Sequence, residues 1–257
     1  MQVYTTEKGF HECEDETLLK PTWQEDGFFE TLLWDGEKLL DLQAHQERIN
    51  RSLEQFYGFS LSIEGIAEKV EKLVTANGTK GKARVRLVAR VNDKACFESL
   101  VVQPYDRSAS DITLRSSDYT PAKKSERSGH KDLRYGDYAK AYAEALQQGA
   151  DEAVLFNDHG ELSECATSNV FFVKGSIVHT PDLASGCLPG IVRRLVIEKL
   201  RGCGIAVEEG FYSRADLVDS DFVFVTNSLR RVQPVAAIDD VKLANKGIEV
   251  LSLLGKV

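Results

Sequence analysis

Apolar and polar residues alternate with a period of two over much of the first hundred positions, and elsewhere they recur with the period of a helix. The two-residue period predicts four strands, over residues 28–34, 38–42, 82–91 and 96–104. The first two would form a hairpin around Asp35-Gly36, a dipeptide that favours a tight turn. Apolar residues three and four positions apart predict helices over residues 43–56 and 63–75.

A polar connector with one short strand at 111–117 follows these elements. Its prolines and clustered serines and aspartates are typical of a domain junction and predict three parts, residues 1–104, 105–130 and 131–257. In the last part we expect helices over residues 135–148 and 190–201. Short strands are predicted at 152–157, 161–165, 169–174, 176–180, 206–209, 222–226 and 232–236. The predicted fold class is α+β, with antiparallel strands dominating.

Composition removes several classes of function. The chain has 257 residues and a net charge of −8, from 32 basic and 40 acidic residues, so we expect no nucleic-acid or anionic-membrane surface. Its five cysteines contain no CxxC pair, and we therefore expect neither a metal site nor a disulfide framework. No run approaches the roughly 20 apolar residues of a membrane span, and no apolar signal core follows Met1. The expected location is the cytoplasm.

Two motifs near the middle of the chain could carry chemistry. In SGHKDLRYGDYAKAY, Lys131 precedes a helix, and a lysine held and partly desolvated in this way can act as a nucleophile. The alternative is a solvated lysine on a loop. In GCLPGIVRRLV, Gly190 stands at a helix start, where the amides of Ile191 and Val192 could bind a phosphate. The alternative there is a simple turn.

Two further residues suggest contacts with an anion and with a protonated ring. Arg48, one turn after His45, could clamp a phosphate, unless it forms a surface pair with a neighbour such as Glu47. Glu164 begins a strand and could keep an aromatic ring nitrogen protonated, unless it is an edge carboxylate facing water. Together the four motifs suggest a cofactor with an aldehyde, a phosphate and a pyridine nitrogen, namely pyridoxal 5′-phosphate.

Longer motifs extend this interpretation to a family. They are GFFETLL with a following H..R, the Lys131…Tyr135 pair, ADEAVLFNDHGELSECATSNVFFVKGSIVHTP, CLPGIVRR and TNSLRRVQPV, in this order between residues 27 and 241. The series resembles the class IV, fold-type IV pyridoxal-phosphate enzymes, which include aminodeoxychorismate lyase and the branched-chain and D-amino-acid aminotransferases. The resemblance implies a small N-terminal α/β domain, a larger barrel-like C-terminal domain and a homodimer.

The resemblance also implies roles for individual residues. Lys131 would carry the cofactor as a Schiff base and move the α-proton, and Glu164 would pair with the pyridine nitrogen. Tyr135 would contact the ring hydroxyl, and Phe29 would line the substrate pocket. The phosphate would be held by the side chain of Arg48, the amides of Ile191 and Val192, and the hydroxyl of Ser228.

The substrate is the least determined part of this interpretation. Thr31, in FFET, matches the lyase members and would serve as a catalytic residue, although some transaminases share it. A substrate carboxylate could bind Arg84, Arg86, Arg90 or Arg134, of which Arg86 and Arg134 are preferred. We therefore expect a lyase acting on a small amino substrate, 4-amino-4-deoxychorismate, with release of 4-aminobenzoate and pyruvate. The alternatives are a class IV aminotransferase and a non-catalytic protein that binds the cofactor.

Overall fold

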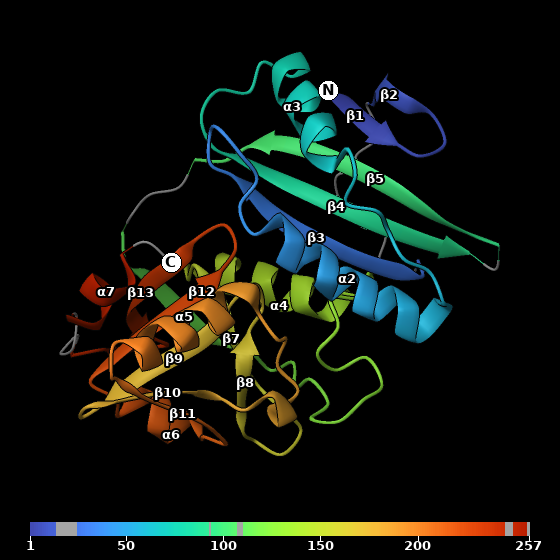
Figure 1. Ribbon diagram of the computed structural model, residues 1–257. Helices are drawn as coiled ribbons and strands as arrows, with labels where there is room; N and C mark the ends of the chain where they lie inside the picture. The colour runs from blue at the N-terminus through green and yellow to red at the C-terminus, as the bar shows by residue number, and fades with distance from the viewer. Residues whose placement is uncertain (14–24, 93, 107–109, 245–248, 256–257) are drawn as a thin grey trace. The chain divides into compact units, whose positions relative to one another are not determined.

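The computed structural model describes residues 1–13, 25–92, 94–106, 110–244 and 249–255, and the chain divides into two compact units. Unit 1 comprises Met1–Ser108 and His130–Tyr135, whereas unit 2 comprises Ala109–Gly129 and Gly136–Val257. Figure 1 colours the chain from the N-terminus to the C-terminus. Each unit has its own sheet and its own apolar core.

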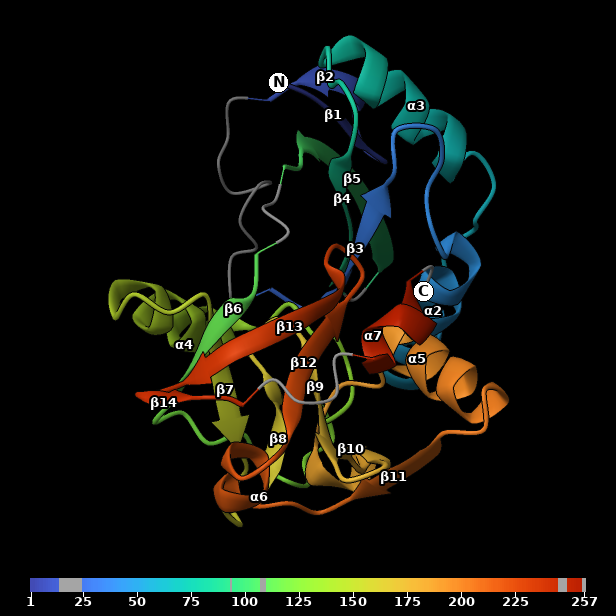
Figure 2. The same cartoon turned by 90° about the vertical axis from the view of Figure 1, so that its left-hand side faces the viewer.

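Unit 1 is a five-stranded antiparallel sheet in the order β2-β1-β5-β4-β3. Its strands are β1 (Gln2–Thr5), β2 (Gly9–Glu12), β3 (Gly27–Trp34), β4 (Ala83–Asn92) and β5 (Ala95–Pro104). Helices α2 (Leu42–Tyr57) and α3 (Ile66–Ala76) cover one face of this sheet (Figures 1 and 2). Alternate strand residues such as Leu32 and Leu87 meet Ile49 and Val70 of the helices, which builds the core from the predicted amphipathic faces.

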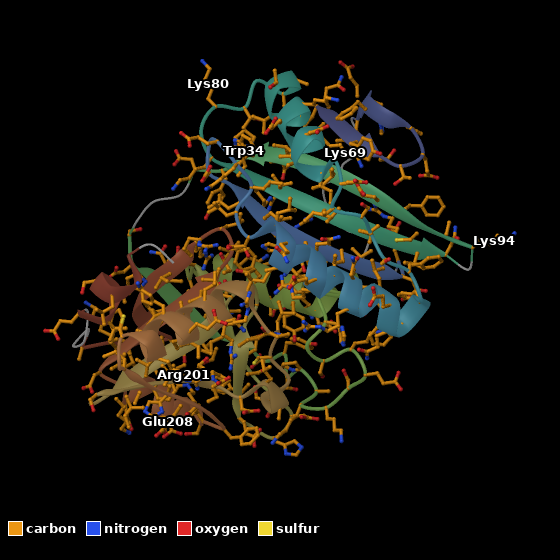
Figure 3. The ribbon with its side chains drawn as sticks, viewed as in Figure 1. Trp34, Lys69, Lys80, Lys94, Arg201 and Glu208 are labelled. Carbon is orange, nitrogen blue, oxygen red and sulfur yellow. The ribbon has the colours of Figure 1, made fainter. Side chains whose placement is uncertain are left out.

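Two parts of unit 1 differ from the prediction. Within the described stretch 25–92 no strand forms at 38–42, and a single bridge joins Trp34 to Leu39. The Asp35 carboxylate accepts the amides of Glu37 and Lys38, each at 2.9 Å, which forms a local turn that ends the ladder. The first hairpin, β1 and β2, has no counterpart in the prediction. Lys69 of α3, labelled in Figure 3, helps to fix β1, because its Nζ lies 4.1 Å from the centre of the Tyr4 ring.

The segment that carries Lys131 belongs to unit 1, whereas the predicted division assigned Lys131 to residues 131–257. The backbone explains the difference. The amide of Phe29 donates to the carbonyl of Lys131, and the amide of Leu133 donates to the carbonyl of Gly27, both at 3.0 Å. Residues 130–135 therefore extend the pairing of β3, although the chain on both sides of them belongs to unit 2.

Unit 2 contains a nine-stranded mixed sheet in the order β11-β10-β9-β12-β13-β6-β7-β8, with β14 paired to β13. The strands are β6 (Ile112–Ser116), β7 (Glu152–Phe156), β8 (Leu162–Cys165), β9 (Asn169–Lys174), β10 (Ile177–Pro181), β11 (Ala206–Gly210), β12 (Phe222–Asn227), β13 (Arg231–Ile238) and β14 (Val241–Lys242). Three pairs are parallel, namely β10 with β11, β6 with β13, and β6 with β7. The other pairs between these strands are antiparallel.

Helices surround the sheet of unit 2. They are α4 (Gly136–Gln147), α5 (Ile191–Gly202), α6 (Arg214–Val218) and α7 (Glu249–Leu254), with the 3-10 helix η1 (Leu183–Ser185). Helix α5 lies beside α7 (Figure 2), and its Val196 and Leu200 pack with Phe171 and Phe224 of the sheet. These contacts fix α5 to strands β9 and β12. No helix within the described residues is long and apolar enough to span a lipid bilayer.

Candidate active site

Lys131 lies against two aromatic rings in unit 1. Its Nζ is 4.5 Å from the centre of the Phe29 ring and 5.5 Å from the centre of the Tyr135 ring. The two rings meet edge to face, with their centres 5.6 Å apart, and Phe29 is buried. The amine is therefore held beside π-systems, which attract it when it is protonated and restrict the water around it. The structure thus brings together three of the residues predicted from the sequence.

The same face of β3 also carries Thr31, because side chains alternate along a strand and Phe29 and Thr31 are two positions apart. Thr31 pairs with Arg86 across β3 and β4. The guanidinium carbon of Arg86 lies 5.5 Å from the centre of the Phe29 ring. Burial, followed by the charge of Arg84, lowers the pKa of Arg86 to about 10. A mostly buried cation thus stands next to Thr31, as a site for an anionic group requires.

The other arginines considered for a substrate carboxylate already have partners on their own unit. Arg84 donates to the side-chain oxygen of Gln103, which lies opposite it on β5. Arg90 Nε donates to Glu25 at 2.6 Å, and Arg90 Nη1 donates to Ser99 at 3.2 Å. Arg134 is exposed and pairs with Asp26. Of the two preferred arginines, Arg86 is mostly buried and lies beside the Phe29 ring, which also contacts Lys131. Arg134 is exposed.

Arg48 is part of a buried ionic cluster on the helix side of β3. Its Nε and Nη2 donate to the two oxygens of Glu30 at 2.8 and 2.6 Å, and His45 Nδ1 lies 2.7 Å from Glu30 Oε2. Glu30 and His45 are fully buried. The surface pair between Arg48 and Glu47 that the sequence left open is thus replaced by a buried bidentate pair with Glu30.

The charges of this cluster follow from its burial. Burial raises the pKa of Glu30, but the charge of Arg48 and the hydrogen bonds from Arg48 and His45 outweigh burial and lower the pKa to about 2. Burial lowers the pKa of His45, so the ring is neutral at pH 7 and donates its Nδ1 proton to Glu30. Glu30 therefore fixes one edge of the Arg48 guanidinium. Sequence reasoning missed Glu30, although a carboxylate between the apolar Phe28 and Leu32 on the core side of a strand was a usable signal.

The Lys131 segment is also attached to α2. His130 Nδ1 lies 2.8 Å from the hydroxyl of Ser52, and the His130 ring meets the Phe56 ring edge to face with centres 5.0 Å apart. Ser52 is one helical turn after Arg48, and its hydroxyl is 3.2 Å from the Arg48 carbonyl. One helix of unit 1 thus positions both Arg48 and the residue before Lys131.

Glu164 is buried on β8 of unit 2, opposite Leu155 of β7. Its Oε2 accepts the amide of Leu188 at 3.1 Å. The carbonyl of Leu188 accepts Asn169 Nδ2 at 2.8 Å. The edge carboxylate facing water that the sequence left open is therefore not what the structure contains. Leu188 joins Glu164 to the loop that leads into α5.

The start of α5 has the geometry of an anion site. Gly190 is the N-cap residue of α5, is in the extended region and offers no side chain to cap the first turn. The amides of Ile191 and Val192 belong to that turn, where the helix dipole favours negative charge. A Cβ at position 190 would overlap Asn169 Oδ1, so the glycine allows the Asn169 side chain to lie this close. Both residues predicted to offer amides thus stand at a helix N-terminus whose N-cap is a glycine, joined to Glu164 through Leu188.

Ser228 lies in the turn between β12 and β13. Asn227 shapes the turn, because its Oδ1 accepts the amides of Leu229 and Arg230 at 3.0 and 2.7 Å. Its Nδ2 donates to the carbonyl of Thr167 at 3.2 Å and to Ser168 Oγ at 3.0 Å. The Ser228 turn is therefore bound to the turn that follows Glu164. Within the described parts of the chain, no group of three or more His, Cys, Asp or Glu side chains could hold a metal ion.

Comparison with known proteins identifies a family and named relatives. The family model "Amino-transferase class IV" matches residues 27–238. The chain is 31% identical over 251 residues to aminodeoxychorismate lyase of Bacillus subtilis (strain 168), covering 89% of this chain and 83% of that protein. It is 38% identical over 112 residues to a probable branched-chain-amino-acid aminotransferase of Aquifex aeolicus (strain VF5), covering 43% of this chain and 36% of that protein.

A solved structure shows the same fold. The branched-chain amino acid aminotransferase from Thermobaculum terrenum, in its pyridoxal-phosphate holo-form, superposes with a TM-score of 0.81 at 22% identity, over 99% of this chain and 91% of that one. The predicted α+β, fold-type IV architecture is thereby confirmed, as is the prediction of an enzyme of this family.

Proposed function

Because this chain belongs to the amino-transferase class IV family, we propose that it is a pyridoxal-phosphate-dependent aminodeoxychorismate lyase. The similarity to the Bacillus subtilis lyase carries this proposal, since it extends over 89% of the chain, whereas that to the Aquifex aeolicus aminotransferase is limited to 43%. The reaction would convert 4-amino-4-deoxychorismate to 4-aminobenzoate and pyruvate.

The donor groups of the chain fit pyridoxal phosphate. Lys131 offers an amine beside aromatic rings, Glu164 offers a buried carboxylate, and α5 offers an N-terminus whose N-cap is a glycine that Asn169 approaches closely. The Thermobaculum terrenum enzyme of this fold is known in its pyridoxal-phosphate form. When bound, pyridoxal phosphate withdraws electrons from the substrate's α-carbon into its protonated ring.

The chain's own residues would then divide the work. Glu164 would hold the proton on the ring nitrogen, and Tyr135 would donate to the ring hydroxyl. Arg48, Ser228 and the amides of Ile191 and Val192 would bind the phosphate.

On the reacting side, Lys131 would carry the cofactor and move the α-proton at its Nζ. Thr31 would orient that amine, and Arg86, its cross-strand neighbour, would bind a substrate carboxylate above the Phe29 ring. Arg134, exposed and paired with Asp26, has less support for a substrate role.

The second candidate is an aminotransferase, which the 38% identity to the Aquifex aeolicus protein favours over its shorter range. Both reactions begin with removal of the α-proton. The lyase then expels a group from the β-carbon, whereas the aminotransferase moves the amino group to the cofactor and releases a 2-oxo acid. A third candidate is a protein that binds the cofactor without turnover.

An anaerobic single-turnover experiment separates these candidates. The cofactor-loaded protein would receive 4-amino-4-deoxychorismate, and then L- and D-amino acids separately, with cofactor absorbance, pyruvate and 4-aminobenzoate measured. We expect equimolar pyruvate and 4-aminobenzoate with the initial absorbance restored. Formation of pyridoxamine phosphate and a 2-oxo acid without those products would instead establish an aminotransferase.

Substitutions of three proposed site residues extend this test. Thr31→Val should reduce lyase turnover while leaving cofactor binding intact, because it removes the hydroxyl and keeps the shape of the side chain. Arg86→Leu should raise KM for the substrate more than it lowers kcat. If Lys131→Ala left every activity unchanged, Lys131 would not be the catalytic residue, and that assignment would be wrong.

We further propose that the enzyme is a homodimer, as the family resemblance implies, and that it acts in the cytoplasm, as expected from the sequence. Sedimentation equilibrium of the loaded protein should give about twice the chain mass of 28.6 kDa. A clean monomer would contradict this part of the proposal.

A further inference from the structure

Glu152 is a fully buried acid at the start of β7 that the proposed mechanism does not use. Its carboxylate accepts hydrogen bonds from the amide of Thr167 at 3.2 Å, from the hydroxyl of Ser168 at 3.2 Å and from the hydroxyl of Thr167. Arg230 Nη1 donates to it at 3.3 Å, and both side chains of this ion pair are buried. Burying an ion pair costs free energy, so stability alone does not explain why a carboxylate with this many donors is buried here.

These donors come from two separate turns of unit 2. Thr167 and Ser168 belong to the turn between β8 and β9, which begins just after Glu164. Arg230 belongs to the turn between β12 and β13, which contains Ser228. Glu152 therefore bonds both the turn next to the ring-nitrogen carboxylate and the turn that carries the phosphate hydroxyl.

Asn227 makes a second connection between the same two turns. Its Nδ2 bonds the Thr167 carbonyl and the Ser168 hydroxyl, and its Oδ1 bonds the amides on the far side of Ser228. Ser168 thus bonds both Glu152 and Asn227. The polar groups form a connected network, and such networks hold segments in one arrangement when every member is satisfied.

We propose that Glu152 is a positioning residue that fixes the Ser228 turn relative to the turn after Glu164, so that the Ser228 hydroxyl is set for the cofactor's phosphate. This inference rests on the proposed function, because that function assigns Ser228 and Glu164 to opposite ends of one cofactor. Glu152 touches neither end itself and acts through Thr167, Ser168 and Arg230.

The hydrogen bonds of both turns converge on the Glu152 side chain, and its surroundings set its charge. Burial raises the pKa of Glu152 to about 7, while the hydrogen bonds from Thr167, Ala153 and Ser168 oppose this rise. Arg230 faces Glu152 directly, and Cys165 lies close enough for Glu152 to raise its pKa, after the larger effect of burial. Glu152→Gln would keep one acceptor oxygen and replace the other with an NH₂ group, so either the Thr167 amide on one side or the two hydroxyls and Arg230 on the other would face a donor in place of their acceptor.

Equilibrium binding to the apoprotein of the full chain tests the proposal with two ligands. Pyridoxal 5′-phosphate carries the phosphate, and pyridoxal lacks it, so the ratio of their dissociation constants isolates the phosphate contacts. For Glu152→Gln we expect the dissociation constant of pyridoxal phosphate to rise about tenfold or more, with that of pyridoxal changed less than about twofold. Asp151→Asn, a neighbouring exposed carboxylate outside the network, should leave both constants unchanged.

Thr167→Val provides a milder version of the same test, since it removes one donor and keeps the carboxylate. If Glu152→Gln does not fold, a rise of about threefold for pyridoxal phosphate alone in Thr167→Val supports the proposal. Unchanged constants in the folded variants would overturn the inference while leaving the proposed function standing. Equal weakening of both ligands would make the role merely structural and overturn it too. Failure of the wild-type protein to bind pyridoxal phosphate would overturn the proposed function, and this inference with it.

Discussion

Replacing Glu30 with glutamine tests the charge assignment of the buried cluster in unit 1. The substitution keeps the size of the side chain but removes the charge that Arg48 and His45 face. The cation of Arg48 would then stay buried without the counter-charge of Glu30, which is more costly than losing both partners together. The apoprotein is the correct sample, because a bound cofactor would add its own stabilisation.

The magnitude follows from the pKa of Glu30. Its lowering from 4.5 to about 2 corresponds to about 3 kcal/mol, at about 1.4 kcal/mol for each pKa unit. Breaking one partner from a buried pair costs roughly 3–5 kcal/mol, which agrees. Because the pKa is lower in the folded protein, the stabilisation is fully present above about pH 4.5 and is lost as the pH falls towards 2.

Urea denaturation followed by circular dichroism at several pH values measures this effect. At pH 7 the variant should lose about 3 kcal/mol in free energy of unfolding, and the difference from wild type should shrink between about pH 4.5 and 2. Glu47→Gln, on the exposed side of the same helix, should change stability by less than about 0.5 kcal/mol. Equal stability of Glu30→Gln and wild type at pH 7, or a difference that does not vary with pH, would refute the assigned ion pair.

Three further predictions concern Lys131, Glu152 and Gly27. Lys131→Arg should abolish the visible absorbance of bound cofactor and reduce turnover at least ~1,000-fold, since arginine is not a nucleophile at neutral pH; a coloured, active variant would contradict the assignment. Glu152 has a raised pKa of about 7, so its contribution to the free energy of unfolding is present below about pH 4.5 and is lost as the pH rises through 7, by about 3 kcal/mol. Glu152→Gln should remove this pH dependence from denaturation curves, and parallel curves for both proteins would count against it. Gly27→Ala should destabilise the fold by more than Gly149→Ala, although both glycines have positive φ. A Cβ at position 27 would overlap the Ala89 carbonyl, whereas a Cβ at position 149 meets no described atom within 4 Å. Calorimetric melting midpoints in the reverse order would exclude the clash.

Periodicity predicted the elements whose apolar faces are complete. The helix expected at 43–56 is α2, and the strand expected at 82–91 is β4, because each buries one regular side against the same core. The first hairpin escaped prediction since β2 is half-buried or exposed throughout and gives no apolar alternation. The strand expected at 38–42 failed because hydrogen bonds to Asp35 and the left-handed Asp41 outweighed a short apolar run.

The sequence indicates candidate site residues, but it does not indicate which side chains surround them. Motifs identified Lys131 and Glu164, and the family resemblance supplied their roles. The partners of Arg48 were not accessible, because Glu30 is 18 residues away and a sequence does not show which charges a core will enclose. The assignment of residues 130–135 to unit 1 depends on backbone pairing with β3, for which side-chain patterns carry no signal.

That pairing has a consequence for how the protein is made. β3 is the outer strand of its sheet, and the exposed backbone of such a strand is a template for association with other chains. Residues 131–133 cover the first part of that edge, but they follow β3 by about a hundred positions. During synthesis this edge therefore stays uncovered until the segment around Lys131 has left the ribosome. The segment that carries Lys131 also covers this strand edge, so we expect substitutions in the segment to change the yield of folded protein as well as any function of Lys131.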